Sequence, residues 1–328
     1  MKIAITALVL SLILALSAHA DLLKILDATV TFIELNTENP QQKVIGNLKY
    51  LKGYSIASNY KHFGGLSGLS YLKEVGDKDL FFVSDRGQVG QFKLDQEYKP
   101  YFTSIQFISG IPWKTSSKKI GDAESITKLK IEDRNHTLIS FEGYHRIMAY
   151  SNAEKNGKAL PMPAEIGMLQ SNGGLETMEA LSDGRLLLMA ERPTIKTKQH
   201  FAWIGSAPKD NPLDFSYITR LITPPEGYSP TDATELPNGD VLVLLRRFTP
   251  IDGVSAKFWR IKKSMLDSSD TITGEVIATI KPPLSVDNME GIAVIDVSKN
   301  GNPIIAVISD DNFNSFQRTL LLIFEVIS

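Results

Sequence analysis

The chain has 328 residues, a formal net charge of −2 and no cysteine. The near-neutral charge argues against a surface that binds nucleic acid, and the lack of cysteine excludes a cysteine nucleophile and thiolate metal ligands. The length is large for one domain, but all-β barrels and propellers reach this size as a single unit.

The first 20 residues have the pattern of a secretory signal peptide. Lys2 supplies positive charge, residues 3–16 are predominantly apolar, and residues 18–20 have the small-x-small pattern of a cleavage site. An uncleaved membrane anchor is the alternative, but the apolar run is short for a bilayer span. We therefore expect a secreted or periplasmic protein, with residues 21–328 as one domain and no transmembrane segment after cleavage.

A two-part motif recurs five times after this leader. Its first part is a Gly-rich or acidic patch that leads into a short apolar strand, aligned on Ser67, Glu124, Glu176, Thr231 and Glu290. Its second part is an apolar strand that ends in charge, at Asp85, Glu142, Glu191, Arg246 and Asp310. A multi-stranded repeat of about 40 to 60 residues is typical of a β-propeller. Radial blades would bring every copy of the motif to one central axis.

Further strands complete the repeated unit. Outer strands rich in β-branched and aromatic residues are predicted at 101–107, 215–222 and 275–280. The chain ends on a third strand, 319–326, whereas residues 43–58 offer an outer strand before the first motif. The sequence therefore predicts an all-β fold, a single β-propeller of five or six blades closed by strands from both termini.

The inner strands begin with a repeated acidic residue. Four of the five carry one, at Glu124, Glu176, Asp232 and Glu290. Carboxylates that share a small volume repel each other, so something must offset their charge. Ca²⁺ is one solution, because it takes six to eight oxygen ligands. Arginines at the strand ends are another, and a ring of ion pairs that only fills the channel would then have no catalytic role.

We expect a site with three kinds of residue. The catalytic candidates are Glu124, Glu176, Arg86 and Arg192. The substrate-binding candidates are Asp85, Glu191 and Arg246. The metal-ligand candidates, for Ca²⁺, are Glu290, Asp310, Asn288 and Asp311. Arginine suits a phosphate or carboxylate group through its planar fork of donors, and scattered histidines argue against a zinc site.

Several strings resemble one known family. They are Phe63-Gly-Gly-Leu-Ser-Gly-Leu, Phe82-Val-Ser-Asp-Arg-Gly, Asp122-Ala-Glu-Ser-Ile, Asn288-Met-Glu-Gly-Ile and Ser309-Asp-Asp-Asn. They are similar to the phytase-like family, described as having "esterase-like activity of phytase", over residues 63–326. The resemblance implies a β-propeller, export, and hydrolysis of phosphate or carboxylic esters.

The favoured function is an exported, monomeric hydrolase that acts on a small-molecule ester, preferably a phosphoester, at the channel mouth. Two alternatives stay open. A metal-dependent, lactonase-like propeller needs a similar set of oxygen ligands with a more apolar mouth. A non-enzymatic binding module would use the acids and arginines only as ion pairs.

Overall fold

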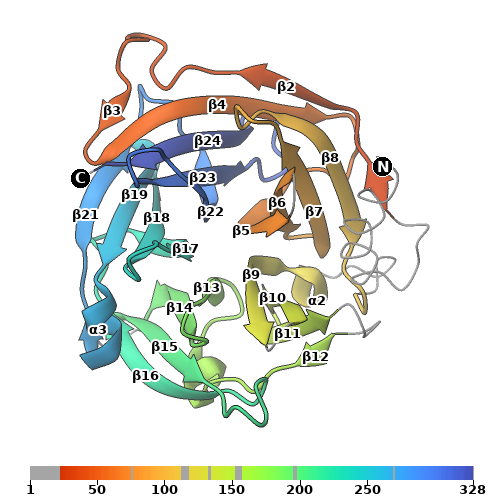
Figure 1. Ribbon diagram of the computed structural model, residues 1–328, viewed down its shortest axis with the longest axis vertical. Helices are drawn as coiled ribbons and strands as arrows, with labels where there is room; N and C mark the ends of the chain where they lie inside the picture. Colours follow the sequence, from red (N-terminus) through yellow and green to blue (C-terminus); the bar gives the residue numbers. More distant parts are fainter. Residues whose placement is uncertain are drawn as a thin grey trace.

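Five β-sheets stand around a central axis like the blades of a propeller (Figure 1). The computed structural model describes residues 23–327, apart from 75–76, 112–117, 132–133, 152–156, 195–197 and 269. The predicted signal peptide therefore lies outside the described residues. The described part of the chain is a five-bladed propeller, which settles the blade number that the sequence left at five or six.

In each blade the four strands counted outward from the axis pair antiparallel. Blade 1 runs from the inside as β5 (Leu66–Glu74), β6 (Asp77–Ser84), β7 (Gln88–Leu94) and β8 (Pro100–Phe107), with β1 (Lys24–Ile25) on the edge. Blade 2 is β9 (Ala123–Ile131), β10 (Arg134–Phe141), β11 (Arg146–Ser151) and β12 (Lys158–Ala159). Blade 3 is β13 (Leu175–Ala180), β14 (Leu186–Pro193), β15 (His200–Ser206), β16 (Ser216–Ile222) and β20 (Thr271–Ile272).

The last two blades follow the same order. Blade 4 is β17 (Ser229–Glu235), β18 (Val241–Thr249), β19 (Gly253–Ile261) and β21 (Glu275–Ile280). Blade 5 is β22 (Asn288–Val297), β23 (Pro303–Asp310), β24 (Thr319–Val326), β4 (Leu48–Ser58) and β2 (Ala28–Phe32), with β3 (Val44–Ile45) beside β4. The described helices are short: α2 (Lys118–Gly121), the 3₁₀ helix η2 (Ala164–Met168) and α3 (Lys263–Ser268). None of them is long and apolar enough to cross a membrane.

Blade 5 joins strands from distant parts of the chain. β4 pairs antiparallel with β24, from Thr319 opposite Ile56 to Val326 opposite Leu48. β2 pairs in turn with the outer side of β4. The segment 43–58, in which the sequence predicted an outer strand, thus supplies the fourth strand of this blade.

The hydrophobic core lies between neighbouring blades. One buried cluster packs Phe258 of blade 4 against Phe324 of blade 5, and another packs Phe82 of blade 1 against Leu321 of blade 5. Trp203 and Trp259, which occupy matching third strands, are both buried. Because the apolar faces of the sheets are buried against each other, the polar starts of the inner strands are left to line the axis.

Candidate active site at the channel mouth

Each inner strand carries a β-bulge at the same level of the propeller. Near the start of every inner strand, its pairing with the second strand skips one residue. The residues skipped there are Gly68, Glu124, Glu176, Thr231 and Glu290. A bulge leaves one residue out of the ladder and re-aims its side chain, and such bulges are common next to active sites. Three glutamates are thereby positioned by the same local distortion at one end of the axis.

The bulges correct the sequence alignment in the first blade. The sequence aligned Ser67 with the glutamates, but the extra residue is Gly68, which has a φ of 47°. A Cβ atom on Gly68 would lie 2.7 Å from the Cα of Ser125 in β9. Glycine is therefore required where the backbones of β5 and β9 approach each other.

A second ring of polar residues surrounds the bulged positions. Its residues lie at the ends of the second strands, and they are Glu142, Glu191, Arg246 and Asp310. Each of them stands opposite the residue of the inner strand that precedes the bulge by two positions. In blade 2 that opposite residue is Asp122, whose carbonyl oxygen accepts a hydrogen bond of 2.8 Å from the amide of Glu142. The acidic mouth, as we call this cluster, comprises both rings together with Asp122 and Asn288.

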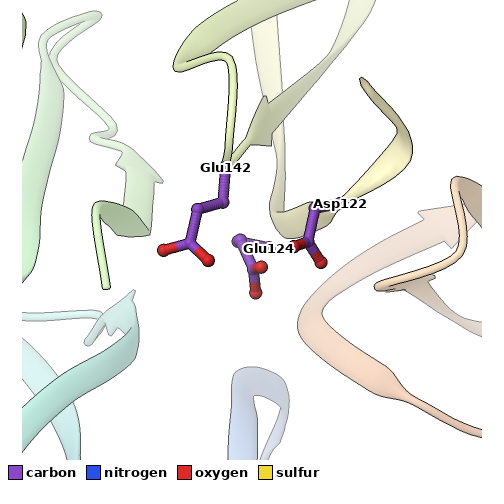
Figure 2. A group of neighbouring side chains, drawn as sticks. All are labelled: Asp122, Glu124 and Glu142. Carbon is purple, nitrogen blue, oxygen red and sulfur yellow. The ribbon is translucent and has the colours of Figure 1, made fainter. Parts of the chain in front are cut away.

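Three carboxylates of blade 2 converge in the acidic mouth. Carboxylate oxygens of Asp122, Glu124 and Glu142 all lie within 4.8 Å of one another. Figure 2 shows the three side chains reaching toward a common space at the axis. Backbone amides of Gly173 and Gly174 donate to Oε1 of Glu142, the second at 2.6 Å, which fixes this carboxylate in place. Hard oxygen donors at this spacing are suited to Ca²⁺ or a similar cation.

Arg246 carries the positive charge inside the acidic mouth. Its guanidinium donates to Asn288 Oδ1 at 2.8 Å and to Glu191 Oε1 at 3.1 Å, and lies 3.2 Å from Glu290 Oε1. Asn288 also donates from Nδ2 to Glu290 Oε1 at 2.7 Å. Arg246 thus joins blades 3, 4 and 5, and it engages two of the residues that the sequence assigned to a metal.

The crowding of carboxylates raises their pKa values. Burial, followed by the charges of Asp122, Glu142 and Glu290, raises the pKa of Glu124 well above its usual range. Burial, followed by Glu191, Glu124 and Glu290, raises the pKa of Glu176 in the same way.

Two more acids of the mouth have raised pKa values. Burial and the charge of Asp310 raise the pKa of Glu290 to about 8, although Arg246 lowers it. Burial raises the pKa of Asp310 to about 7, with Asp85 and Asp311 adding to the effect. Protons or a cation must therefore compensate the negative charge at neutral pH.

The remaining predicted residues stand at the rim. Asp311 accepts 3.0 Å hydrogen bonds from the amides of Gly65 and Phe313, so it holds the loop after β23 against blade 1. Arg86 is exposed and stacks on the ring of Phe313, 3.2 Å from its centroid. Arg192 is exposed and lies 3.4 Å from Glu191 Oε2. Asp85 follows β6 directly, and its charge contributes to the raised pKa of Asp310.

Asp232 has a structural role below the mouth. It lies one residue beyond the bulge and accepts hydrogen bonds from the amides of Leu69 and Ile292 at 3.0 and 2.9 Å and from the Ser125 hydroxyl at 3.2 Å. The Ser125 hydroxyl also lies 3.2 Å from the carbonyl oxygen of Met178. These contacts connect all five inner strands, so the fourth acid of the sequence pattern ties the blades together.

The other end of the axis holds a separate cavity. It has a volume of about 190 Å³ and is lined by the far ends of all five inner strands, including Glu179 and Glu235. Thr127 donates to Glu179 Oε2 and the amide of Glu235 donates to Glu179 Oε1, both at 2.9 Å. The hydrogen bonds of Asp232 to the neighbouring inner strands lie between this cavity and the acidic mouth.

Asp122 and Glu142 are the site residues that sequence reasoning left out. Both belong to the recurring motif, Glu142 as a charged strand end and Asp122 two residues before a bulge. The signal was therefore present. The sequence alone did not show that blade 2 would bring its carboxylates closer together than blade 5.

Together, the fold and this site define a class: a five-bladed propeller with a ring of carboxylates at one end of its axis. A family model for "Esterase-like activity of phytase", the phytase-like family, matches residues 61–313. The chain belongs to this family. No curated protein sequence matches the chain.

Solved structures share the architecture at low sequence identity. The endo-arabinase from Bacteroides thetaiotaomicron superposes with a TM-score of 0.51 and 14% identity, over 82% of this chain and 95% of that one. The α-L-arabinofuranosidase from Podospora anserina gives 0.52 and 10%, over 82% and 93%. A thermostable family-43 glycoside hydrolase gives 0.51 and 11%, over 80% and 89%. Such low identity supports the propeller fold alone.

Proposed function

We propose that the protein hydrolyses an ester, preferably a phosphoester, at the acidic mouth, with a divalent cation such as Ca²⁺ held among the carboxylates. The convergence of Asp122, Glu124 and Glu142 carries this proposal, because their oxygens lie within 4.8 Å of one another. Membership in the phytase-like family supports ester chemistry. The sequence had suggested a cation at Glu290, Asp310, Asn288 and Asp311, whereas we propose a cation at the three carboxylates of blade 2.

The donor set in blade 2 fits a hard cation. All three side chains offer carboxylate oxygens, and backbone amides already orient Glu142. Burial and the neighbouring carboxylates of Asp122, Glu142 and Glu290 raise the pKa of Glu124. A bound Ca²⁺ would supply that charge and polarise a phosphoryl oxygen. A phosphoester is itself anionic, so a mouth lined with carboxylates would otherwise repel it.

The chain's own side chains suit the remaining tasks. Glu290 and Asp310 have pKa values of about 8 and 7, near the pH at which a general acid or base is most effective. Arg246 holds Glu290 and Glu191 in place. Arg86 and Arg192, exposed at the rim, are placed to contact the anionic group as it enters.

A substrate panel with and without cation tests the proposal. Purified mature protein should hydrolyse p-nitrophenyl phosphate in CaCl₂ and lose this activity in chelator. The Glu124→Gln and Glu142→Gln variants should lose it as well, whereas Glu97→Gln, far from the mouth in the turn before β8, serves as a matched control. Hydrolysis that is indifferent to the chelator and to both mouth variants would refute the proposal.

The Arg246 network favours one alternative, a binding module. If its ion pairs only stabilise the propeller, wild-type protein should hydrolyse neither p-nitrophenyl phosphate nor p-nitrophenyl acetate. The Glu290→Gln variant separates the two functions. A hydrolase should lose activity with little change in melting temperature, because Arg246 keeps Glu191 and Asn288 as partners. A binding module would show no activity to lose.

A further inference from the structure

The loops around the acidic mouth expose large apolar side chains at their tips. Ile251 and Phe248, in the β18–β19 hairpin, are 95% and 66% exposed; Phe316, after β23, is 94% exposed; and Tyr144, after β10, is 73% exposed. These are four of the five most exposed large hydrophobic residues in the described part of the chain. They come from three blades but all project from the face that carries the mouth.

The loops around the acidic mouth, taken together, also carry an excess of exposed positive charge. Among their described residues, the exposed cations are Lys61, Arg86, Arg192, Lys198, Lys281 and Arg318. The exposed acids are Glu226 and Asp252. The carboxylates of the mouth itself are recessed, and Glu142, Glu191 and Asp310 are buried. Asp85 and Asp311 at the rim are half-buried and do not cancel this excess. The outer rim is therefore cationic although the whole chain has a net charge of −2.

From this arrangement we propose that the mouth face docks on a lipid bilayer that contains anionic phospholipids. Exposed cations are attracted to the negative surface potential of such a bilayer. The apolar tips then enter the boundary between headgroups and acyl chains. The tips stand on separate loops with polar residues between them, and a bilayer accepts separate protrusions, whereas protein partners favour a contiguous apolar patch. This inference does not depend on the proposed hydrolysis.

Vesicle flotation of the mature protein tests the docking. Wild type should float with vesicles of phosphatidylcholine and phosphatidylglycerol, less with phosphatidylcholine alone, and less at high salt. The double variant Ile251→Ser/Phe316→Ser should need roughly tenfold more lipid for half-binding. The matched control Tyr101→Ser/Ile218→Ser changes residues that are 57% and 53% exposed on the outer strands β8 and β16. It should bind like wild type.

A second pair of variants tests the charge. Lys61→Gln/Arg318→Gln should weaken binding to the phosphatidylglycerol vesicles and leave binding to phosphatidylcholine unchanged. This pair keeps the proposal open to refutation if the serine variant does not fold. Hydrolysis of a water-soluble ester should be the same in all these variants, so a failure of docking is distinguishable from a failure of the proposed function.

Three results would overturn the docking. Wild type that does not float with either vesicle is the first. The second is equal loss of binding in the tip variant and in the outer-strand control. The third is a lipid-free wild-type dimer that becomes monomeric in Ile251→Ser/Phe316→Ser, because the tips would then be buried in a second copy of the chain.

Discussion

Without a bound cation, the folded protein should lose stability as the pH rises from about 4 to 8. Asp310 shows the size of the effect, because burial raises its pKa from 3.8 to about 7. Its folded-state pKa exceeds the unfolded value, so its stabilising proton is fully present below pH 3.8 and is lost as the pH rises through 7. At 1.36 kcal/mol per pKa unit, ionising Asp310 costs the folded state about 4 kcal/mol.

Other acids add to this loss in the same direction. The pKa of Glu290 is raised to about 8, and the pKa values of Glu124 and Glu176 are raised well above their usual range. One kcal/mol shifts the melting temperature of a large domain by roughly 2–4 °C, so Asp310 alone corresponds to a fall of roughly 8–15 °C. Calorimetry in chelator over this pH range measures the slope, and the Asp310→Asn variant should reduce it.

Calcium should oppose the loss where the acids are ionised. Ligand carboxylates must be deprotonated to bind a metal, so added Ca²⁺ should raise the melting temperature more at pH 8 than at pH 5. A ligand at a hundredfold excess over its Kd stabilises by about 2.7 kcal/mol. A melting temperature that stays flat or rises with pH in chelator would refute the charge argument. An equal calcium effect at both pH values would refute the cation site.

Two substitutions test the packing of the site, each with its own control. Arg246→Met removes the cation that contacts both Glu290 and Glu191 and should cost about 3–5 kcal/mol in urea unfolding. Arg192→Met, at an exposed ion pair, should cost less than about 1 kcal/mol, and equal costs would show that Arg246 does not hold the mouth together. Gly68→Ala should cost more than the roughly 1–2 kcal/mol of a left-handed alanine alone, because its Cβ would meet the backbone of β9. Gly184→Ala, which also has positive φ but open space around it, should cost only that smaller amount, and no difference between the two would contradict the close approach of β5 and β9.

The propeller could be predicted because its signals are local and repeated. Alternating apolar strands and turns recur in every unit, and the repeat interval allows few other architectures. The outer strand of blade 2 was missed, since β12 spans only Lys158–Ala159 and has no run of apolar residues. Short edge strands are formed by their pairing partners more than by their own sequence.

The sequence predicted that the repeated acids would gather at one end of the axis, but it did not predict which of them contact each other. The β-bulges determine which carboxylates approach each other. A bulge shifts the strand pairing by one residue, and no reliable sequence motif predicts it. In blade 5, Asn288 and Glu290 contact Arg246, which comes from a different blade. A contact between residues 42 positions apart in the chain, such as Arg246 and Asn288, depends on how the blades pack.

Asp232 lies one residue after the bulge of its strand, whereas Glu176 lies at the bulge of its own, and we expect the first to be structural and the second to act in the proposed hydrolysis. Asp232 faces into the layer of inner strands, and Asp232→Ala would leave the amides of Leu69 and Ile292 without their acceptor. Each unsatisfied buried donor costs about 1–3 kcal/mol, so the variant should lose about 2–6 kcal/mol of stability.

Glu176 occupies the bulge itself, and its pKa is raised by burial and by the carboxylates of Glu191, Glu124 and Glu290. Removing its charge in Glu176→Gln relieves repulsion, so the melting temperature at pH 8 in chelator should hold or rise while ester hydrolysis falls. Calorimetry and an ester assay on both variants measure the two effects. If Asp232→Ala melts like wild type, or if Glu176→Gln unfolds at a lower temperature with its activity intact, the division between the structural acid and the mouth acids is wrong. We expect this division because Glu176 lies at the bulge, outside the ladder, whereas Asp232 accepts hydrogen bonds from backbone amides of two neighbouring inner strands.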